Sequence, residues 1–199
     1  MRKPTVFYGL AALGLTSAVL VLGISPQQQA AGARKQAQIK RGEYLTHAGG
    51  CNDCHSPKVF VKMGEMVVPM PDTSRLLSGY PADTKLPPVP EGVIAPDKWG
   101  GLFSNDLTAW AGPWGVSFTR NITPDVATGI GSWTEEMFIK TIRTGKHMGE
   151  GRDLLPPMPW PEYAKLSDDD LKAIFAYLQS IKPIKNAVPD PIPPPPMKK

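Results

Sequence analysis

The sequence is poor in cysteine, since Cys51 and Cys54 are the only two among 199 residues. Small exported domains that depend on disulfides carry a set of them, and two cysteines cannot supply such a framework. The excess of one sign of charge is also small: the chain has 22 Lys and Arg and 18 Asp and Glu, for a net charge of +4. No basic stripe with interleaved aromatic residues occurs, so nucleic acid is not an expected partner. The chain needs another source of stability, and a buried cofactor is the economical candidate.

The first residues have the pattern of an export segment. Arg2 and Lys3 precede an uncharged stretch over residues 5–24, and polar residues follow it. The stretch, at about 20 residues, is also long enough to cross a bilayer as a helix, while Ala31-Gly32-Ala33 fits a small-x-small cleavage site. We therefore expect residues 1–33 to be either a signal peptide or an N-terminal inner-membrane anchor. Both alternatives place the remainder in the periplasm, with the basic residues inside.

Regular periodicity is missing between residues 56 and 120, where nine prolines and many glycines interrupt the chain. We expect a long irregular insertion there, of the kind that is usually functional or disordered. Its second half contains Trp99, Trp110 and Trp114, which indicates packing against another part of the domain. Seven further prolines lie beyond residue 182. They predict an extended, polyproline-type C-terminal arm over residues 183–199.

Helical patterns lie on both sides of this insertion. A first helix is expected over residues 34–48, and Ser132 with Glu135 fits the capping box of a second that ends near Gly145. Ser167 begins the clearest helix, closed by Pro183, with apolar residues at Leu171, Ile174, Phe175, Leu178 and Ile181. The predicted fold is therefore all-α, with one domain over residues 34–182. Gly42 either lets the first helix cross closely over the last one near Tyr177 or is an ordinary surface glycine.

The most informative motif is Cys51-Asn52-Asp53-Cys54-His55. Its spacing allows each thiol to form a thioether with a haem vinyl group while the adjacent His ligates the iron. A zinc site would need further ligands that do not follow in the sequence, and a redox dithiol usually occurs in a βαβ context that is missing here. The motif thus predicts one covalently attached haem c, with His55 as an axial ligand.

A second axial ligand must come from elsewhere in the chain. Met158 is favoured because flanking prolines stiffen its loop, which lowers the entropy lost on fixing the thioether. A sulfur ligand would also raise the potential of the iron. The alternatives are that Met158 merely fills the core, or that the ligand is Met148, His147 or His47, or that the position is open.

Two further residues are candidates for contacts with the haem propionates. Trp133 has an indole N–H that can donate to a propionate, and Arg143 has a charge that can pair with one. The alternatives are a core aromatic side chain and a solvated charge on a helix.

Several segments resemble class I c-type cytochromes, and in particular the cytochrome subunits of membrane-bound alcohol and gluconate dehydrogenases. The closer similarity covers residues 121–189, about a third of the chain. It is carried by Asn121-Ile122-Thr123-Pro124-Asp125, Thr128-Gly129-Ile130-Gly131-Ser132-Trp133-Thr134, the Met158 loop, Leu166-Ser167-Asp168-Asp169-Asp170-Leu171 and Asn186-Ala187-Val188-Pro189. The resemblance implies a helical haem pocket with His55 and Met158 as axial ligands. Those subunits carry several haems, whereas this chain has one attachment motif.

The expected function is electron transfer between a periplasmic or membrane-bound dehydrogenase or respiratory complex and an acceptor, without catalysis by the chain itself. An iron with both axial positions filled does not readily bind peroxide or oxygen, and the cofactor performs the redox step. One alternative is a haem enzyme or gas-binding sensor with an open sixth position. Another is a subunit docked permanently in a larger complex.

Overall fold

The computed structural model describes residues 25–95 and 97–194, so the expected export segment up to residue 24 and the end of the arm lie outside the described residues. No helix among the described residues is long and apolar enough to cross a membrane. The elements are α1 (Pro26–Ala48), α2 (Cys51–His55), β1 (Lys58–Met63), β2 (Met66–Pro71), β3 (Leu102–Phe103), β4 (Ala109–Gly112), β5 (Gly115–Phe118), α3 (Glu135–Thr144), the 3₁₀ helix η1 (His147–Gly149), α4 (Trp160–Tyr163) and α5 (Asp168–Ser180).

The expectation of an all-α fold is wrong, because two antiparallel sheets occupy parts of the segment that was expected to be irregular. Strands β1 and β2 form a hairpin, and β3, β4 and β5 form a three-stranded sheet in that order. The hairpin is favoured by β-branched residues on both strands and by Gly64, whose φ of 63° suits a two-residue turn. The sequence analysis interprets Pro69 and Pro71 as signs of irregular structure. They are compatible with β2, because proline is tolerated on an edge strand.

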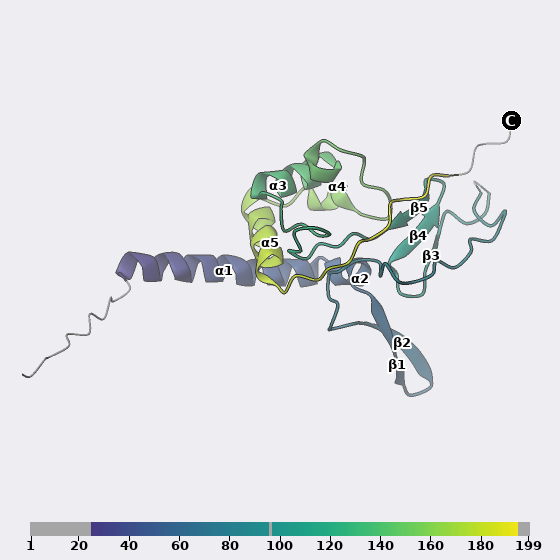
Figure 1. Cartoon of the computed structure of the whole chain (residues 1–199), viewed down its shortest axis with the longest axis horizontal. Coiled ribbons are helices and arrows are strands. Elements are labelled where there is room, and N and C mark those ends of the chain that lie inside the picture. Colours follow the sequence, from purple (N-terminus) through teal and green to yellow (C-terminus); the bar gives the residue numbers. More distant parts are fainter. Residues whose placement is uncertain (1–24, 96, 195–199) are drawn as a thin grey trace, which may run out of the picture.

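Helix α1 is longer than expected and begins at Pro26 rather than at residue 34. Ser25 caps it, with its hydroxyl accepting a hydrogen bond from the Gln28 amide while the Gln28 side chain reaches back to the Ser25 amide. The small residues 31–33 therefore lie inside this helix, and its N-terminal part extends away from the body (Figure 1).

The close crossing of α1 and α5 is confirmed. A Cβ atom on Gly42 would lie 1.8 Å from the carbonyl oxygen of Ala173 and 2.9 Å from Cβ of Tyr177, so any side chain would separate the helices. Arg41 adds an ion pair to Asp170 at 2.9 Å, near the N-terminus of α5, where a carboxylate is also favoured by the helix dipole.

Both later helices occur where the sequence predicts them, with one change of cap. Ser167 caps α5 as expected, since its hydroxyl accepts from the Asp170 amide. Thr134 rather than Ser132 caps α3, accepting from the Met137 amide, and Gly145 ends that helix with a φ of 66°. The main apolar core lies between these helices and consists of Leu77, Ile130, Phe138, Ile142, Leu171, Ile174, Phe175 and Leu178.

The C-terminal arm is extended, as expected, but it packs on the body. Asn121 donates from Nδ2 to the Ile184 carbonyl at 2.7 Å, and Ile192 pairs with Val116 of β5. Val188 is buried in a second small core with Tyr80, Ala109 and Phe118. In Figure 1 the arm, in yellow, runs from α5 across to the β3–β5 sheet, so it joins the two halves of the domain.

Candidate functional site

A largely apolar pocket is enclosed by the main core and by the chain on both sides of it. Its walls include side chains of the core itself, contributed by α3 and α5, and one end is formed by α2. Natural interiors are close-packed, so a core arranged around an open pocket indicates that an apolar group of some size belongs inside it. The pocket brings together five of the six expected site residues: Cys51, Cys54, His55, Trp133 and Met158.

Helix α2 positions the two cysteines and the histidine together. Gly50 links it to α1 with a φ of 70°, a conformation that side chains rarely adopt. Within α2, the pKa of Cys51 is raised to about 11 and that of Cys54 is also raised, in both cases chiefly by burial. A reactive redox dithiol needs thiol pKa values that are lowered. The environment of these two thiols therefore argues against the dithiol alternative.

The imidazole of His55 is held in one orientation. Its Nδ1 lies 2.7 Å from the carbonyl oxygen of Arg120, to which it can donate a hydrogen bond. Burial lowers the pKa of His55, an effect only partly opposed by this hydrogen bond, so the neutral imidazole is favoured. A neutral ring whose Nδ1–H is so engaged has Nε2 free as a metal ligand. His55 thus has the donor atom and the outer contact that an axial ligand requires.

Met158 reaches the same pocket on a loop that β5 holds in place. The Ser117 hydroxyl of β5 donates to the Pro156 carbonyl at 2.5 Å. Met148, the rival methionine, is 41% exposed and does not line the pocket. Among the rival histidines, His47 does not line it either, whereas His147 does and packs edge-on against Trp133 with ring centroids 5.3 Å apart.

Arg143 lies elsewhere in the structure. Its guanidinium pairs with the Asp168 carboxylate at 2.5 Å and donates to the Ala164 carbonyl, and it is not among the residues that line the pocket. This ion pair joins the end of α3 to the start of α5.

The positive charges at the pocket come instead from Arg120 and Arg152, which were not among the predicted site residues. The pKa of Arg120 is lowered by burial and by the charge of Arg152. Arg120 forms one ion pair, at 3.9 Å, with the carboxylate of the almost fully exposed Asp190. The only sequence signal was the position of Arg120 directly before the Asn121-Ile122-Thr123 segment. Two like charges beside an apolar cavity fit a ligand with an apolar body and two carboxylates, as haem has.

Part of the insertion over residues 56–120 supplies one wall of the pocket. Trp110 of β4 and Phe118 of β5 line it, so the β3–β5 sheet belongs to the site. The Trp110 indole donates to the Leu107 carbonyl at 2.9 Å, which fixes the ring. The expectation that the tryptophans mark a packed second half is confirmed for Trp110 and wrong for Trp99, which is 67% exposed.

Comparison with known proteins finds similarity to cytochrome subunits. The chain is 32% identical over 177 residues, 87% of its length, to the cytochrome c subunit of gluconate 2-dehydrogenase from Pantoea cypripedii. It is 31% identical over 179 residues to the cytochrome c subunit of the quinone alcohol dehydrogenase of Gluconobacter oxydans, and 28% identical over 183 residues to the fructose dehydrogenase cytochrome subunit of Gluconobacter japonicus. The chain is thus similar in sequence to part of several dehydrogenase cytochrome c subunits. No protein-family model matches it.

This similarity supports the expected relationship to cytochrome subunits, and haem c is the group that the names of these relatives imply. The chain spans only 31%, 29% and 29% of the lengths of those three relatives. Its similarity therefore extends over a part of each relative.

Proposed function

We propose that this chain is a single-haem c-type cytochrome that passes electrons between a dehydrogenase and a respiratory acceptor in the periplasm. The observation that carries the proposal is that His55 and Met158 line the same apolar pocket as the two cysteines of the attachment motif. Imidazole, thioether and two thiols are the donor set that a covalently attached, six-coordinate haem needs. The single motif in the chain supports one haem.

Each of these residues has a defined task in the proposed site. Cys51 and Cys54 hold the haem through thioether bonds, and Nε2 of His55 ligates the iron while the Arg120 carbonyl fixes the ring. Met158 supplies the second ligand. When bound, the haem provides the one-electron redox chemistry, and the protein tunes its potential.

The surroundings of the pocket support transfer rather than substrate chemistry. Apolar side chains of α3 and α5 exclude water from the pocket, which favours a stable ligation of the iron. Arg120 and Arg152 hold the propionates, with Trp133 as a further donor. If His55 and Met158 both ligate the iron, a bound haem would offer no open site for an oxidisable substrate.

The domain arrangement in this proposal follows from the expected export segment. Residues 1–33 direct the chain out of the cytoplasm, either as a cleaved signal or as an anchor, and residues 34–182 form the haem domain. The arm is expected over residues 183–199, and its described part, residues 183–194, completes the pocket, since Pro191 lines it.

The test uses the full chain expressed in a host able to mature c-type cytochromes. The mature protein should carry the mass of one haem, and replacing both Cys51 and Cys54 by Ala should abolish its attachment. Met158→Ala should remove the sulfur-to-iron absorption band and allow carbon monoxide to bind the reduced protein. Met148→Ala is the matched control and should leave the spectrum unchanged. A wild-type chain without added porphyrin mass would contradict the proposal.

A further inference from the structure

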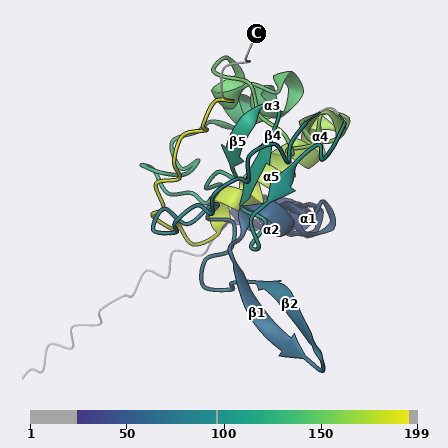
Figure 2. The same cartoon turned by 90° about the vertical axis from the view of Figure 1, so that its right-hand side faces the viewer.

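The β1–β2 hairpin stands apart from the rest of the molecule. In both views it projects from the body, joined to it only at its base (Figures 1 and 2). The register pairs Val59 with Met70, Val61 with Val68, and Met63 with Met66. Residues that face each other across an antiparallel pair point to the same side of the sheet. These six residues therefore form one side of the hairpin, which we call the apolar face.

The apolar face carries no polar or charged side chain, and most of it is exposed. The exposed fractions are 56% for Met63, 68% for Met66 and 45% for Met70, with the two β1 valines above 40%. The opposite face differs in chemistry, because it contains two lysines among its six residues: Lys58, Phe60, Lys62, Val67, Pro69 and Pro71. A surface patch of uniform apolar side chains on a projecting element indicates a contact with another molecule.

The base of the hairpin is fixed to α2, the helix that carries the cysteines. Lys58 donates from Nζ to three carbonyl oxygens, those of Asn52 at 3.1 Å, Asp53 at 2.9 Å and Ser56 at 2.5 Å. A two-stranded hairpin alone is only marginally stable. The lysine therefore holds the hairpin in a defined position next to the pocket.

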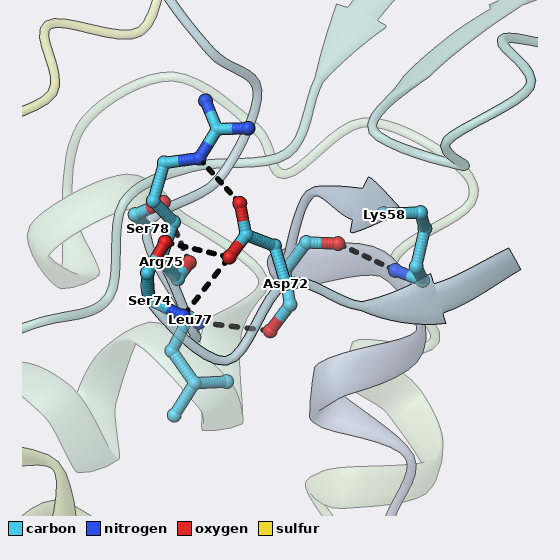
Figure 3. A network of polar contacts seen from close by, with 7 residues as sticks. Lys58, Asp72, Ser74, Arg75, Leu77 and Ser78 are labelled. Atoms are coloured by element: carbon cyan, nitrogen blue, oxygen red, sulfur yellow. Dashed lines mark hydrogen bonds and ion pairs between the residues drawn. The ribbon is translucent and has the colours of Figure 1, made fainter. Parts of the chain in front are cut away.

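A second set of contacts holds the other end of the base (Figure 3). The Asp72 carboxylate accepts hydrogen bonds from the hydroxyl of Ser74 at 2.6 Å and from Nε of Arg75 at 2.9 Å. The buried Ser56 hydroxyl accepts from the Leu77 amide at 2.8 Å and donates to Asn52 of α2. The hairpin is thus anchored at its base, next to α2.

The size of the apolar face limits what it can bind. At the exposures given above, the five side chains other than Val68 present on the order of 450 Å² of apolar surface, within the range of the largest patch on a monomer. A stable protein interface takes about 800 Å² from each partner, whereas weak redox encounters use less. Two copies meeting through these faces alone would not form a stable dimer. The area fits a transient partner that offers an uncharged, apolar surface.

A lipid bilayer is a less suitable partner for this hairpin. No strand pairs with the outer edge of β1 in the part of the chain that the structure describes, so backbone groups along that edge would enter hydrocarbon without hydrogen bonds. Glu65 lies in the turn at the tip, where an inserting hairpin would have to bury its carboxylate.

We propose that the apolar face of the β1–β2 hairpin is the docking surface for the dehydrogenase that reduces this cytochrome. The partner offers an apolar, uncharged patch to Val59, Val61, Met63, Met66, Val68 and Met70, and the complex is short-lived. Docking there brings the partner beside α2, because Lys58 ties the two elements together. The inference rests on the proposed function, since it requires that a dehydrogenase reduce the chain.

The test compares two neighbouring residues of β2 that point to opposite faces. Met66 is 68% exposed on the apolar face and Val67 is 64% exposed on the other, so Met66→Lys and Val67→Lys add the same charge at similar exposure. The haem-loaded variants are mixed with membranes of the source organism from a strain lacking this gene. Gluconate, ethanol and fructose serve in turn as electron donors, and haem reduction is followed by stopped flow. Ascorbate, which needs no docking surface, is the control reductant.

We expect Met66→Lys to be reduced by the membranes at least tenfold more slowly than Val67→Lys, with equal rates with ascorbate. Equal rates with the membranes would overturn the docking proposal while leaving the proposed function intact. If ascorbate reduces the wild-type chain but the membranes reduce it with none of the three electron donors, both the docking proposal and the proposed function would be overturned. If Met66→Lys fails to mature, Val61→Lys and Phe60→Lys provide the same comparison on β1.

Two further measurements separate the other partners. Flotation with vesicles of three parts phosphatidylethanolamine and one part phosphatidylglycerol would reveal a lipid partner, and sedimentation velocity would reveal a second copy. We expect neither vesicle binding nor self-association by wild-type protein. Either one, if abolished by Met66→Lys and retained by Val67→Lys, would overturn the assignment to the dehydrogenase.

Discussion

The two small sheets of this protein come from one segment of chain, and they use their apolar side chains in opposite ways. In the β3–β5 sheet Ala109 and Phe118 are 3% and 8% exposed and face the body. In the β1–β2 hairpin Phe60 and Met66 are 52% and 68% exposed and face outward. The same secondary structure therefore makes a wall of the pocket in one place and a projecting surface in the other.

The difference comes from what covers each sheet. The C-terminal arm pairs with β5 through Ile192 and buries Val188 against Phe118, so the β3–β5 sheet has a neighbour that takes up its apolar side. No such segment lies over the hairpin among residues 25–95 and 97–194, and its contacts are confined to its base. Side-chain type alone thus does not tell an inner wall from an outer surface.

The largest expected effect tests this contrast with one substitution in each sheet. Phe118→Ala removes a buried ring that packs at a tilt against Tyr80, with ring centroids 4.7 Å apart. We expect it to lower the free energy of unfolding by about 3–5 kcal/mol. Phe60→Ala, at an exposed position, should change it by less than about 0.5 kcal/mol. Urea unfolding of the haem-loaded variants, followed by circular dichroism, measures both. Equal losses would mean that the hairpin is as well covered as the sheet.

A second test asks whether the β3–β5 sheet, and not the β1–β2 hairpin, supports the Met158 loop. Ser117→Ala removes the hydrogen bond to the Pro156 carbonyl, at a cost of about 1–1.5 kcal/mol in the free energy of unfolding. We also expect a weaker sulfur-to-iron band and easier displacement of Met158 at alkaline pH. Ser74→Ala, which removes a hydroxyl at the base of the hairpin, is the control and should leave the band unchanged. A band unaltered in both variants would show that β5 does not hold the loop.

The hairpin base should have its own dependence on acid. Hydrogen bonds from Ser74 and Arg75 lower the pKa of Asp72 below its usual value. A carboxylate with a lowered pKa contributes stability above its unfolded pKa, near 4, and this contribution is lost as the pH falls through the folded pKa. Wild type should therefore exceed Asp72→Ala by about 0.5 kcal/mol at pH 7 and by less below pH ~3. Thermal unfolding at both pH values provides the check, and a difference that persists in acid would assign the effect to packing.

The smallest expected effect concerns salt. Because the apolar face carries no charge, its contact with the dehydrogenase has little electrostatic steering to lose. Reduction of wild type by the membranes should change by less than about twofold between roughly 0.05 and 0.5 M salt. A decrease of tenfold or more would place the contact on a charged surface and remove the functional contrast between the two sheets.

The sequence predicted the parts of the fold that rest on local signals. Ser167 and the apolar spacing after it predicted α5. Gly42 offered the helix crossing as one of two interpretations. Both signals can be recognised from a few neighbouring residues of the sequence. The strands were missed although Val59, Val61 and Gly64 favour a hairpin, since the neighbouring prolines were read as breaks throughout. Strands of four residues, such as β4 and β5, carry too short a pattern to identify.

For the site, the sequence found residues whose chemistry is distinctive and missed those defined by position. Cys51, Cys54 and His55 are recognisable by spacing, and Met158 by its rigid loop. Arg143 lies on an expected helix and was the one arginine considered, whereas Arg120 and Arg152 lie outside the expected helices. Only the folded chain shows that Arg143 pairs with Asp168 while Arg120 and Arg152 meet at the pocket.

Arg120 connects two distant ends of the polypeptide through one residue. Its backbone oxygen faces the imidazole of His55, while its guanidinium donates to the carbonyls of Val188 and Pro189 in the arm. In the proposed cytochrome, a binding event that displaces the arm would therefore act on the ring of the proposed iron ligand through a single amino acid. A partner bound to the arm would then influence the redox potential without entering the pocket.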